Sequence, residues 1–162
     1  MLPDLLETNL NVVFCGSAAG TKSAERGHYY AGPGNQFYAI LHKTGLTPSL
    51  LKPDQYPSLL QHRIGLTDLN QTESGMDKHL SKGGFDIGAF RSKIESFQPK
   101  FIAFNGKKAA QEYFASTGFD YGAHPATLGR TRIFVMPSTS GAARGFWDEQ
   151  IWHALASEIT LS

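Results

Sequence analysis

The stretch "GLTDLN" (residues 65–70) ends in polar side chains that could carry out catalysis. Asp68 and Asn70 stand two residues apart, so their side chains share one side of an extended chain. A carboxylate such as Asp68 can orient a water molecule and balance a developing positive charge, and the amide of Asn70 can both donate and accept hydrogen bonds. We therefore expect these residues to form a catalytic site, with Glu73 as a reserve carboxylate. Alternatively, Asp68 caps a helix or forms a turn, and Asn70 has a structural role.

A second candidate site is the glycine-framed turn in "VVFCGSAAG" (residues 12–20). Gly16 and Gly20 indicate that the chain bends sharply there or lets a ligand approach the backbone closely. Between them lie Ser17, Ala18 and Ala19, none of which is an acid, a base or a good metal ligand. Chemistry at this turn must therefore come from backbone N–H groups or from side chains elsewhere.

Apolar strand patterns alternate with helical patterns along the chain. We predict strands at residues 11–16, 65–70, 101–106 and 131–137, and helices at residues 35–43, 58–63, 86–97, 107–116 and 146–159. This alternation predicts an α/β fold of the three-layer α/β/α type, a parallel sheet covered on both faces, in a single domain spanning residues 1–162. Ligands of such folds bind beyond the carboxyl ends of the strands, which draws attention to loops 16–34, 68–75, 105–107 and 137–144. Asn105, in the third of these, is expected to cap the helix that follows it, and the alternative is that it donates a hydrogen bond in the pocket.

Composition bounds the possible partners. The net charge is only +1, so contact with DNA would rely on a local patch and on backbone amides. Cys15 is the single cysteine, which excludes an internal disulfide and a cysteine-held zinc site and suits a reducing compartment. The chain has no apolar run of about 18 residues and no signal-peptide pattern. We expect a cytoplasmic monomer that binds no membrane, metal or cofactor.

Several motifs in register carry a resemblance to a known family. "VVFCG", "SAAG" and "AGPGNQFY" stand near the start, and "VMPSTSGAAR" stands near the end. Between them, "GLTDL", "FQPKFIAFNGKKA" and "GRTRIFVMP" keep the family's order and spacing. The sequence resembles the mismatch-specific uracil/thymine DNA glycosylases of the uracil-DNA glycosylase superfamily over nearly its whole length. The resemblance implies a four-stranded parallel sheet and a monofunctional enzyme of base excision repair. Such an enzyme flips uracil out of DNA, hydrolyses its glycosidic bond and leaves an abasic site.

The resemblance also implies a uracil pocket. Its substrate-binding residues would be Gly16, Ser17, Ala18, Tyr30, Asn35 and Ser138. In the relatives an aromatic ring at the place of Tyr30 stacks on the flipped pyrimidine, and the backbone N–H groups of Ser17 and Tyr30 would hold the uracil carbonyls. Alternatively, Tyr30 is a packing residue and Asn35 is a helix cap.

The "GAAR" motif corresponds to the family's DNA-insertion loop. Backbone groups of Gly141, Ala142 and Ala143 would face the orphaned partner base, and Arg144 would contact phosphates or the gap. The relatives carry a larger wedge residue after the glycine, so Ala142 and Ala143 predict weaker plugging of the gap. Arg144 could instead be an ordinary surface arginine.

Ala18 departs from the family, because the relatives carry there an asparagine that positions the attacking water. Either the protein binds uracil, abasic sites or mismatches without turnover, or Asp68 has taken over and Asn70 reads the edge of the uracil. Hydrolysis tolerates such a change because oriented amides stabilise the departing uracil anion. An unrelated small-molecule enzyme on a doubly wound fold is a further alternative.

Overall fold

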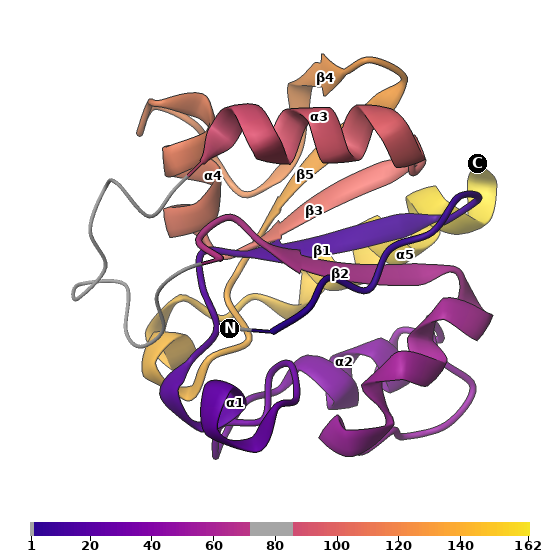
Figure 1. Cartoon of the computed structure of the whole chain (residues 1–162), viewed down its shortest axis with the longest axis vertical. Coiled ribbons are helices and arrows are strands. Elements are labelled where there is room, and N and C mark those ends of the chain that lie inside the picture. Colours follow the sequence, from indigo (N-terminus) through magenta and orange to yellow (C-terminus); the bar gives the residue numbers. More distant parts are fainter. Residues whose placement is uncertain (1, 72–85) are drawn as a thin grey trace.

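The computed structural model describes residues 2–71 and 86–162 (Figure 1). Its centre is a five-stranded sheet of order β2-β1-β3-β5-β4. The strands are β1 (Val12–Gly16), β2 (Ile64–Asp68), β3 (Phe101–Asn105), β4 (Gly122–Leu128) and β5 (Thr131–Met136). The first four strands of that order run parallel, and β4 is antiparallel to β5. The sheet is thus mostly parallel, as expected from the alternation of strands and helices.

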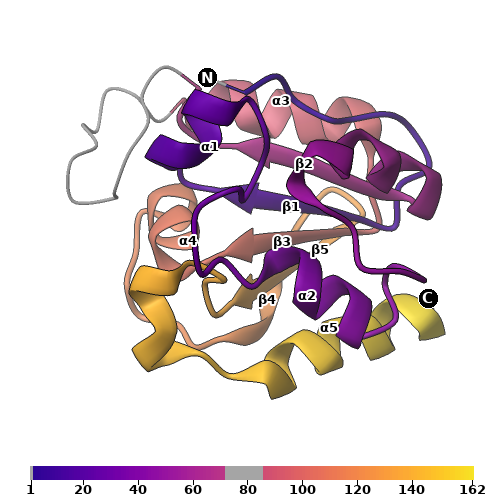
Figure 2. The same ribbon diagram turned by 90° about the horizontal axis from the view of Figure 1, so that it is seen from below.

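Helices cover both faces of the sheet, which makes three layers (Figures 1 and 2). The helical segments are α1 (Thr21–Arg26), α2 (Phe37–Lys43), η1 (Pro53–His62), α3 (Ile87–Phe97), α4 (Lys107–Phe114), η4 (Gly141–Phe146) and α5 (Glu149–Leu161). Phe37 of α2 and Trp152 of α5 pack with Phe14 on one face. Phe90 of α3 and Ala110 of α4 lie in the core on the other. The α/β/α layering predicted from the sequence is confirmed.

The fifth strand, β4, was not predicted, and its sequence explains why. Pro125 lies in the middle of "GAHPATL" and cannot donate a ladder hydrogen bond. The pairing of β4 with β5 shifts register between His124 and Thr127, so the proline occupies an irregularity in an edge strand. A two-residue turn with Gly129 at a φ of 59° then leads into β5. The prediction of four strands, all parallel, was therefore wrong by one antiparallel edge strand.

The N-terminal segment covers the opposite edge of the sheet. Leu5 and Leu66 exchange two backbone hydrogen bonds of 2.9 Å, so an antiparallel bridge protects the outer side of β2. Tyr29 anchors the same segment by donating from its hydroxyl to the carbonyl oxygen of Pro3 at 2.9 Å. These contacts leave no room for a side chain on Gly65, where a Cβ would lie 2.7 Å from the Leu5 carbonyl oxygen.

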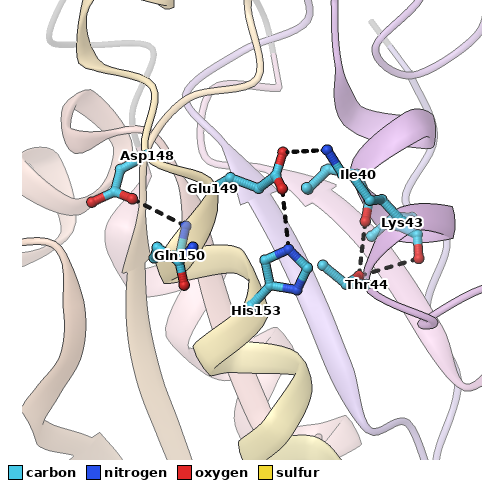
Figure 3. A network of polar contacts seen from close by, with 8 residues as sticks. Ile40, Lys43, Thr44, Asp148, Glu149, Gln150 and His153 are labelled. Carbon is cyan, nitrogen blue, oxygen red and sulfur yellow. Dashed lines mark hydrogen bonds and ion pairs between the residues drawn. The ribbon is translucent and has the colours of Figure 1, made fainter.

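Helices α2 and α5, on the same face, are joined by a polar network (Figure 3). Lys43 Nζ lies 2.9 Å from one carboxylate oxygen of Glu149, and His153 Nε2 lies 3.2 Å from the other. Hydrogen bonding to Lys43 and His153 lowers the pKa of the exposed Glu149 carboxyl. Asp148 begins α5 by accepting a hydrogen bond from the Gln150 N–H at 3.0 Å. The network holds the N-terminal end of α5 beside the C-terminal end of α2. The loops that precede these two helices lead into the candidate site.

We predict that Gly65→Ala destabilises the protein by about 1–3 kcal/mol, because the added methyl group would push the N-terminal segment off β2. Unfolding by urea, followed by circular dichroism, would measure the change in free energy. Gly118→Ala is the matched control, since a Cβ on Gly118 meets no atom within 4 Å. Equal stability of the two variants would contradict the close packing at Gly65.

Candidate active site

The polar strand ends predicted from the sequence meet at one edge of the sheet. Gly16 at the end of β1 pairs in register with Asp68 at the end of β2. On the other side of β1, β3 ends at Asn105, whose register partner on β5 is Met136. The loops that follow all four strands therefore start from the same edge, as expected for a parallel sheet.

The carboxylate of Asp68 lies over the end of β1. Asp68 is only 5% exposed, and a Cβ built on Gly16 would lie 2.7 Å from its Oδ1 atom. Any side chain at position 16 would displace the carboxylate, so the glycine is required by a close approach rather than by an unusual φ. Asp68 is the last residue of the strand.

Tyr30 brings a buried hydroxyl to the same place. The Cβ built on Gly16 would also lie 3.5 Å from Tyr30 Oη. This hydroxyl is buried and makes no hydrogen bond with any residue that the structure describes. The ring packs on Phe37, with 4.1 Å between centroids, and the backbone of Tyr30 takes a φ of 54°. The backbone of Tyr30 is thus held in the left-handed region, which residues other than glycine rarely adopt. Its buried hydroxyl lies near the carboxylate of Asp68.

Asn105 ties the end of β3 to the loop after β5. Its Nδ2 donates to Thr139 Oγ1 at 3.0 Å, and its Oδ1 accepts from the Thr139 N–H at 3.0 Å. The expectation that Asn105 caps the following helix was wrong, because the N-cap of α4 is Gly106, which has no side chain to cap with. Asn105 lies close enough to Tyr30 to favour the ionised phenol, but its amide is already committed to Thr139. Spacing along the sequence offered no signal for this pairing.

Two motifs that are far apart in the sequence lie against each other. Gln36 donates its N–H to the Thr139 carbonyl at 2.9 Å, and Arg144 Nη2 donates to the Gly34 carbonyl at 3.2 Å. A Cβ on Gly141 would lie 3.4 Å from the carbonyl oxygen of Pro33. The "AGPGNQFY" and "STSGAAR" segments therefore form one continuous rim of the site.

The other candidate residues are placed as follows. Asn35 Oδ1 accepts from the Phe37 N–H at 3.0 Å, so its side chain helps to begin α2. Ser138 Oγ accepts from the Ser140 N–H at 3.2 Å. Asn70 is buried, and its N–H donates to the Ser17 carbonyl at 2.7 Å, which sets the two loops after β1 and β2 side by side. Ala18 follows directly in this loop, and Glu73 lies outside the described residues.

The electrostatics of the site follow from burial. Burial raises the pKa of the Asp68 carboxyl to about 7, with a further increase from Asp4 and an opposing effect of Lys93. Asp4 is held on the α3 side of the sheet, 2.6 Å from Thr67 Oγ1 and 2.5 Å from Lys93 Nζ. Burial and the neighbouring Asp68 also raise the pKa of the Tyr30 phenol. Asp68 can therefore exchange a proton near neutral pH, while Tyr30 stays neutral.

The described residues also bear on metal binding, on membranes and on the single cysteine. Within residues 2–71 and 86–162, no three His, Cys, Asp or Glu side chains are gathered so that they could hold a metal ion. No helix in these ranges is long and apolar enough to span a membrane. Cys15 is buried in β1, and burial raises the pKa of its thiol.

Comparison with known proteins identifies the family. The family model described as "Uracil DNA glycosylase superfamily" matches residues 3–156. The chain belongs to this superfamily. Its fold is similar to the solution NMR structure of a "putative Uracil DNA glycosylase" from Methanosarcina acetivorans, at 24% sequence identity and a TM-score of 0.69. The match covers 98% of this chain and 96% of that chain, and at this identity it shows the fold.

Membership of the uracil DNA glycosylase superfamily supports a DNA glycosylase activity, a hydrolytic reaction of DNA repair with DNA as partner. The resemblance noted in the sequence is confirmed at the level of the superfamily. Within it, the site brings together Gly16, Asp68 and Tyr30 at the sheet edge, with Asn70 beside the first loop.

The raised pKa of Asp68 predicts how stability depends on pH. The folded chain binds the carboxyl proton more tightly than the unfolded chain, so the stabilisation from this proton is lost as pH rises from about 4 to about 7. Asp68→Asn cannot ionise, and it should gain about 1–3 kcal/mol relative to the natural protein between about pH 5 and pH 8. Urea unfolding at both pH values measures this difference.

Asp120→Asn, at an exposed carboxyl, is the matched control and should show no such gain. An Asp68→Asn protein that is less stable than the natural one by the same amount at both pH values would show that the carboxylate has a purely structural role.

Proposed function

We propose that this protein is a monofunctional uracil-DNA glycosylase of base excision repair, and a divergent relative of the mismatch-specific uracil/thymine enzymes. Its substrate would be DNA that contains uracil or mismatches, and it would act as a single-domain monomer in the cytoplasm, at the nucleoid in a bacterium. The observation that carries the proposal is the buried carboxylate of Asp68 over Gly16, beside the loop whose position 18 has lost its polar side chain.

The leaving group is stabilised by the backbone. Uracil in duplex DNA is inaccessible within the stack, so the nucleotide is rotated into the pocket. As the bond between C1′ and N1 breaks, its electron pair stays on uracil. The N–H groups of Ser17 and Tyr30 donate to the carbonyl oxygens that then carry negative charge. The amide of Asn70 donates to O4 and accepts from N3, which favours uracil. Asn35 and Ser138 shape the rim of this pocket.

Asp68 supports the other half of the reaction. Its carboxylate balances the positive charge that develops on the sugar and orients the attacking water, whose oxygen bonds to C1′ while a proton passes to the carboxylate. With a pKa of about 7, Asp68 is substantially ionised at and above neutral pH. The reaction needs no group at position 18, because the strand next to β1 supplies the carboxylate.

A second candidate is a relative that binds lesions, abasic sites or mismatches without cleavage. Ala18 favours it, since the family's water-positioning asparagine is missing there. Gly141, Ala142, Ala143 and Arg144 would contact DNA in both cases, so binding alone does not separate the two candidates.

We predict that the natural protein releases uracil from duplex DNA in a chelating buffer, and that Asp68→Asn lowers the single-turnover rate by about 100-fold or more. The natural rate should rise with pH up to about 7 and then level off, because the ionised carboxyl is the active form. Alkaline cleavage of the abasic product and gel electrophoresis measure the rate.

Asp120→Asn controls for the loss of a carboxylate and should keep the natural rate. Folded Asp68→Asn protein that cleaves as fast as the natural protein would remove Asp68 from the reaction and direct attention to Asn70. Binding to uracil-containing DNA with no cleavage by the natural protein would favour the second candidate.

We further predict that Tyr30→Phe lowers the single-turnover rate or the affinity for uracil-DNA by about tenfold, because the Tyr30 hydroxyl, which makes no hydrogen bond within residues 2–71 and 86–162, can bond with the substrate. Since the variant also removes a buried, unpaired hydroxyl, its melting temperature should be equal or higher. Tyr113→Phe, on α4, is the control for the chemical change. A lower melting temperature with an unchanged rate would assign Tyr30 to packing alone.

A further inference from the structure

We propose that Phe146 is the residue that inserts into the DNA stack when a nucleotide is flipped out, in place of a side chain at Ala142 or Ala143. The proposal rests on the proposed function, because it assumes an extruded nucleotide in duplex DNA. The partner of Phe146 is therefore a DNA duplex in which an extruded nucleotide has left a gap in the base stack.

Exposure of the ring is the first observation. Phe146 is 69% exposed, and among the described residues the only other large hydrophobic side chains with comparable exposure are Leu50 and Leu161. All the other phenylalanines of the described part of the chain are more covered than Phe146. A flat apolar ring in water is the kind of side chain that DNA-bending proteins insert between base steps.

The position of Phe146 in η4 is the second observation. A 3₁₀-helix has about three residues per turn, so Phe146 stands one turn after Ala143 on the same face. Long helical side chains lean toward the N-terminus of their helix, which favours a ring directed toward the turn that holds the small side chain of Ala143. Gly145 adds no side chain beside it. The small residues thus leave open the space that a ring from the next turn can use.

The third observation is that hydrogen bonds and ring packing hold η4 in place. Ser140 Oγ accepts from the Ala142 N–H at 3.2 Å and begins the helix, and Arg144 joins it to the Gly34 carbonyl at 3.2 Å. Directly after Phe146, Trp147 packs with its ring centroid 6.0 Å from that of Trp152, in the core. The ring of Phe146 is therefore presented from a fixed backbone, with the exposed, positively charged Arg144 nearby.

The location fits contact with a duplex. Figure 2 shows η4, in light orange before α5, at the side of the molecule toward which the strands point. This is the edge where Gly16, Asp68 and Asn105 end their strands. A duplex that delivers a nucleotide to Asp68 would meet the rim formed by the 31–38 and 138–144 segments, and η4 begins in that rim.

The test measures binding to a duplex with a tetrahydrofuran abasic analogue and a 2-aminopurine next to it, and to the single strand of the same sequence. Phe146→Ala should weaken duplex binding by about tenfold and abolish the fluorescence change of 2-aminopurine. Binding to the single strand should stay within about twofold, because a single strand has no gap to fill. Phe146→Leu should retain most of the duplex affinity, and Leu50→Ala is the control for the loss of an exposed apolar side chain.

Equal losses on duplex and single strand, or no loss on the duplex, would overturn the proposal. So would a natural protein that binds the abasic duplex no better than an undamaged one. Melting temperatures of all variants show whether they are folded, and Phe146→Leu keeps the test informative if Phe146→Ala is not. The measurement needs no turnover, so a protein that fails to cleave uracil would refute the proposed function while this binding test still decides the role of Phe146.

Discussion

The parallel pairing of Gly16 with Asp68 is the constraint on which the site depends. It sets the end of β2 beside the end of β1, and the missing side chain of Gly16 provides the space that the Asp68 carboxylate fills. Burial at this place raises the pKa of the carboxyl, and the protein loses some stability near neutral pH to keep an ionisable group there. The N-terminal segment contributes by closing the open edge of β2.

Around this pair, long-range hydrogen bonds hold the loops. The Asn105–Thr139 pair joins β3 to the loop after β5, and the Gln36 N–H joins that loop to the start of α2. Arg144 completes the contact through the Gly34 carbonyl. Apart from Arg144, these bonds use backbone groups and short, uncharged side chains.

Under the proposed function, the carboxylate of Asp68 takes the role of a polar side chain at Ala18 from one strand away. This carboxylate, at the end of β2, lies over the end of β1. Small residues at Ala142 and Ala143 are likewise accompanied by an exposed ring one helical turn later, at Phe146. Both proposals assign the role to a neighbouring position, because parallel strand ends and helix turns bring alternative positions to the same point.

The sequence by itself determined the layered α/β architecture and the candidate carboxylate, because strand and helix periodicities are local and Asp68 ends a clear strand pattern. It also located the two motifs that became the rim. It did not reveal β4, since Pro125 hides an irregular edge strand, nor the pairing of Asn105 with Thr139, which are 34 residues apart. Only the tertiary structure decided the burial of Asp68 and of the Tyr30 hydroxyl, and the exposure of Phe146. These properties depend on which distant segments cover a side chain, and no local pattern encodes that.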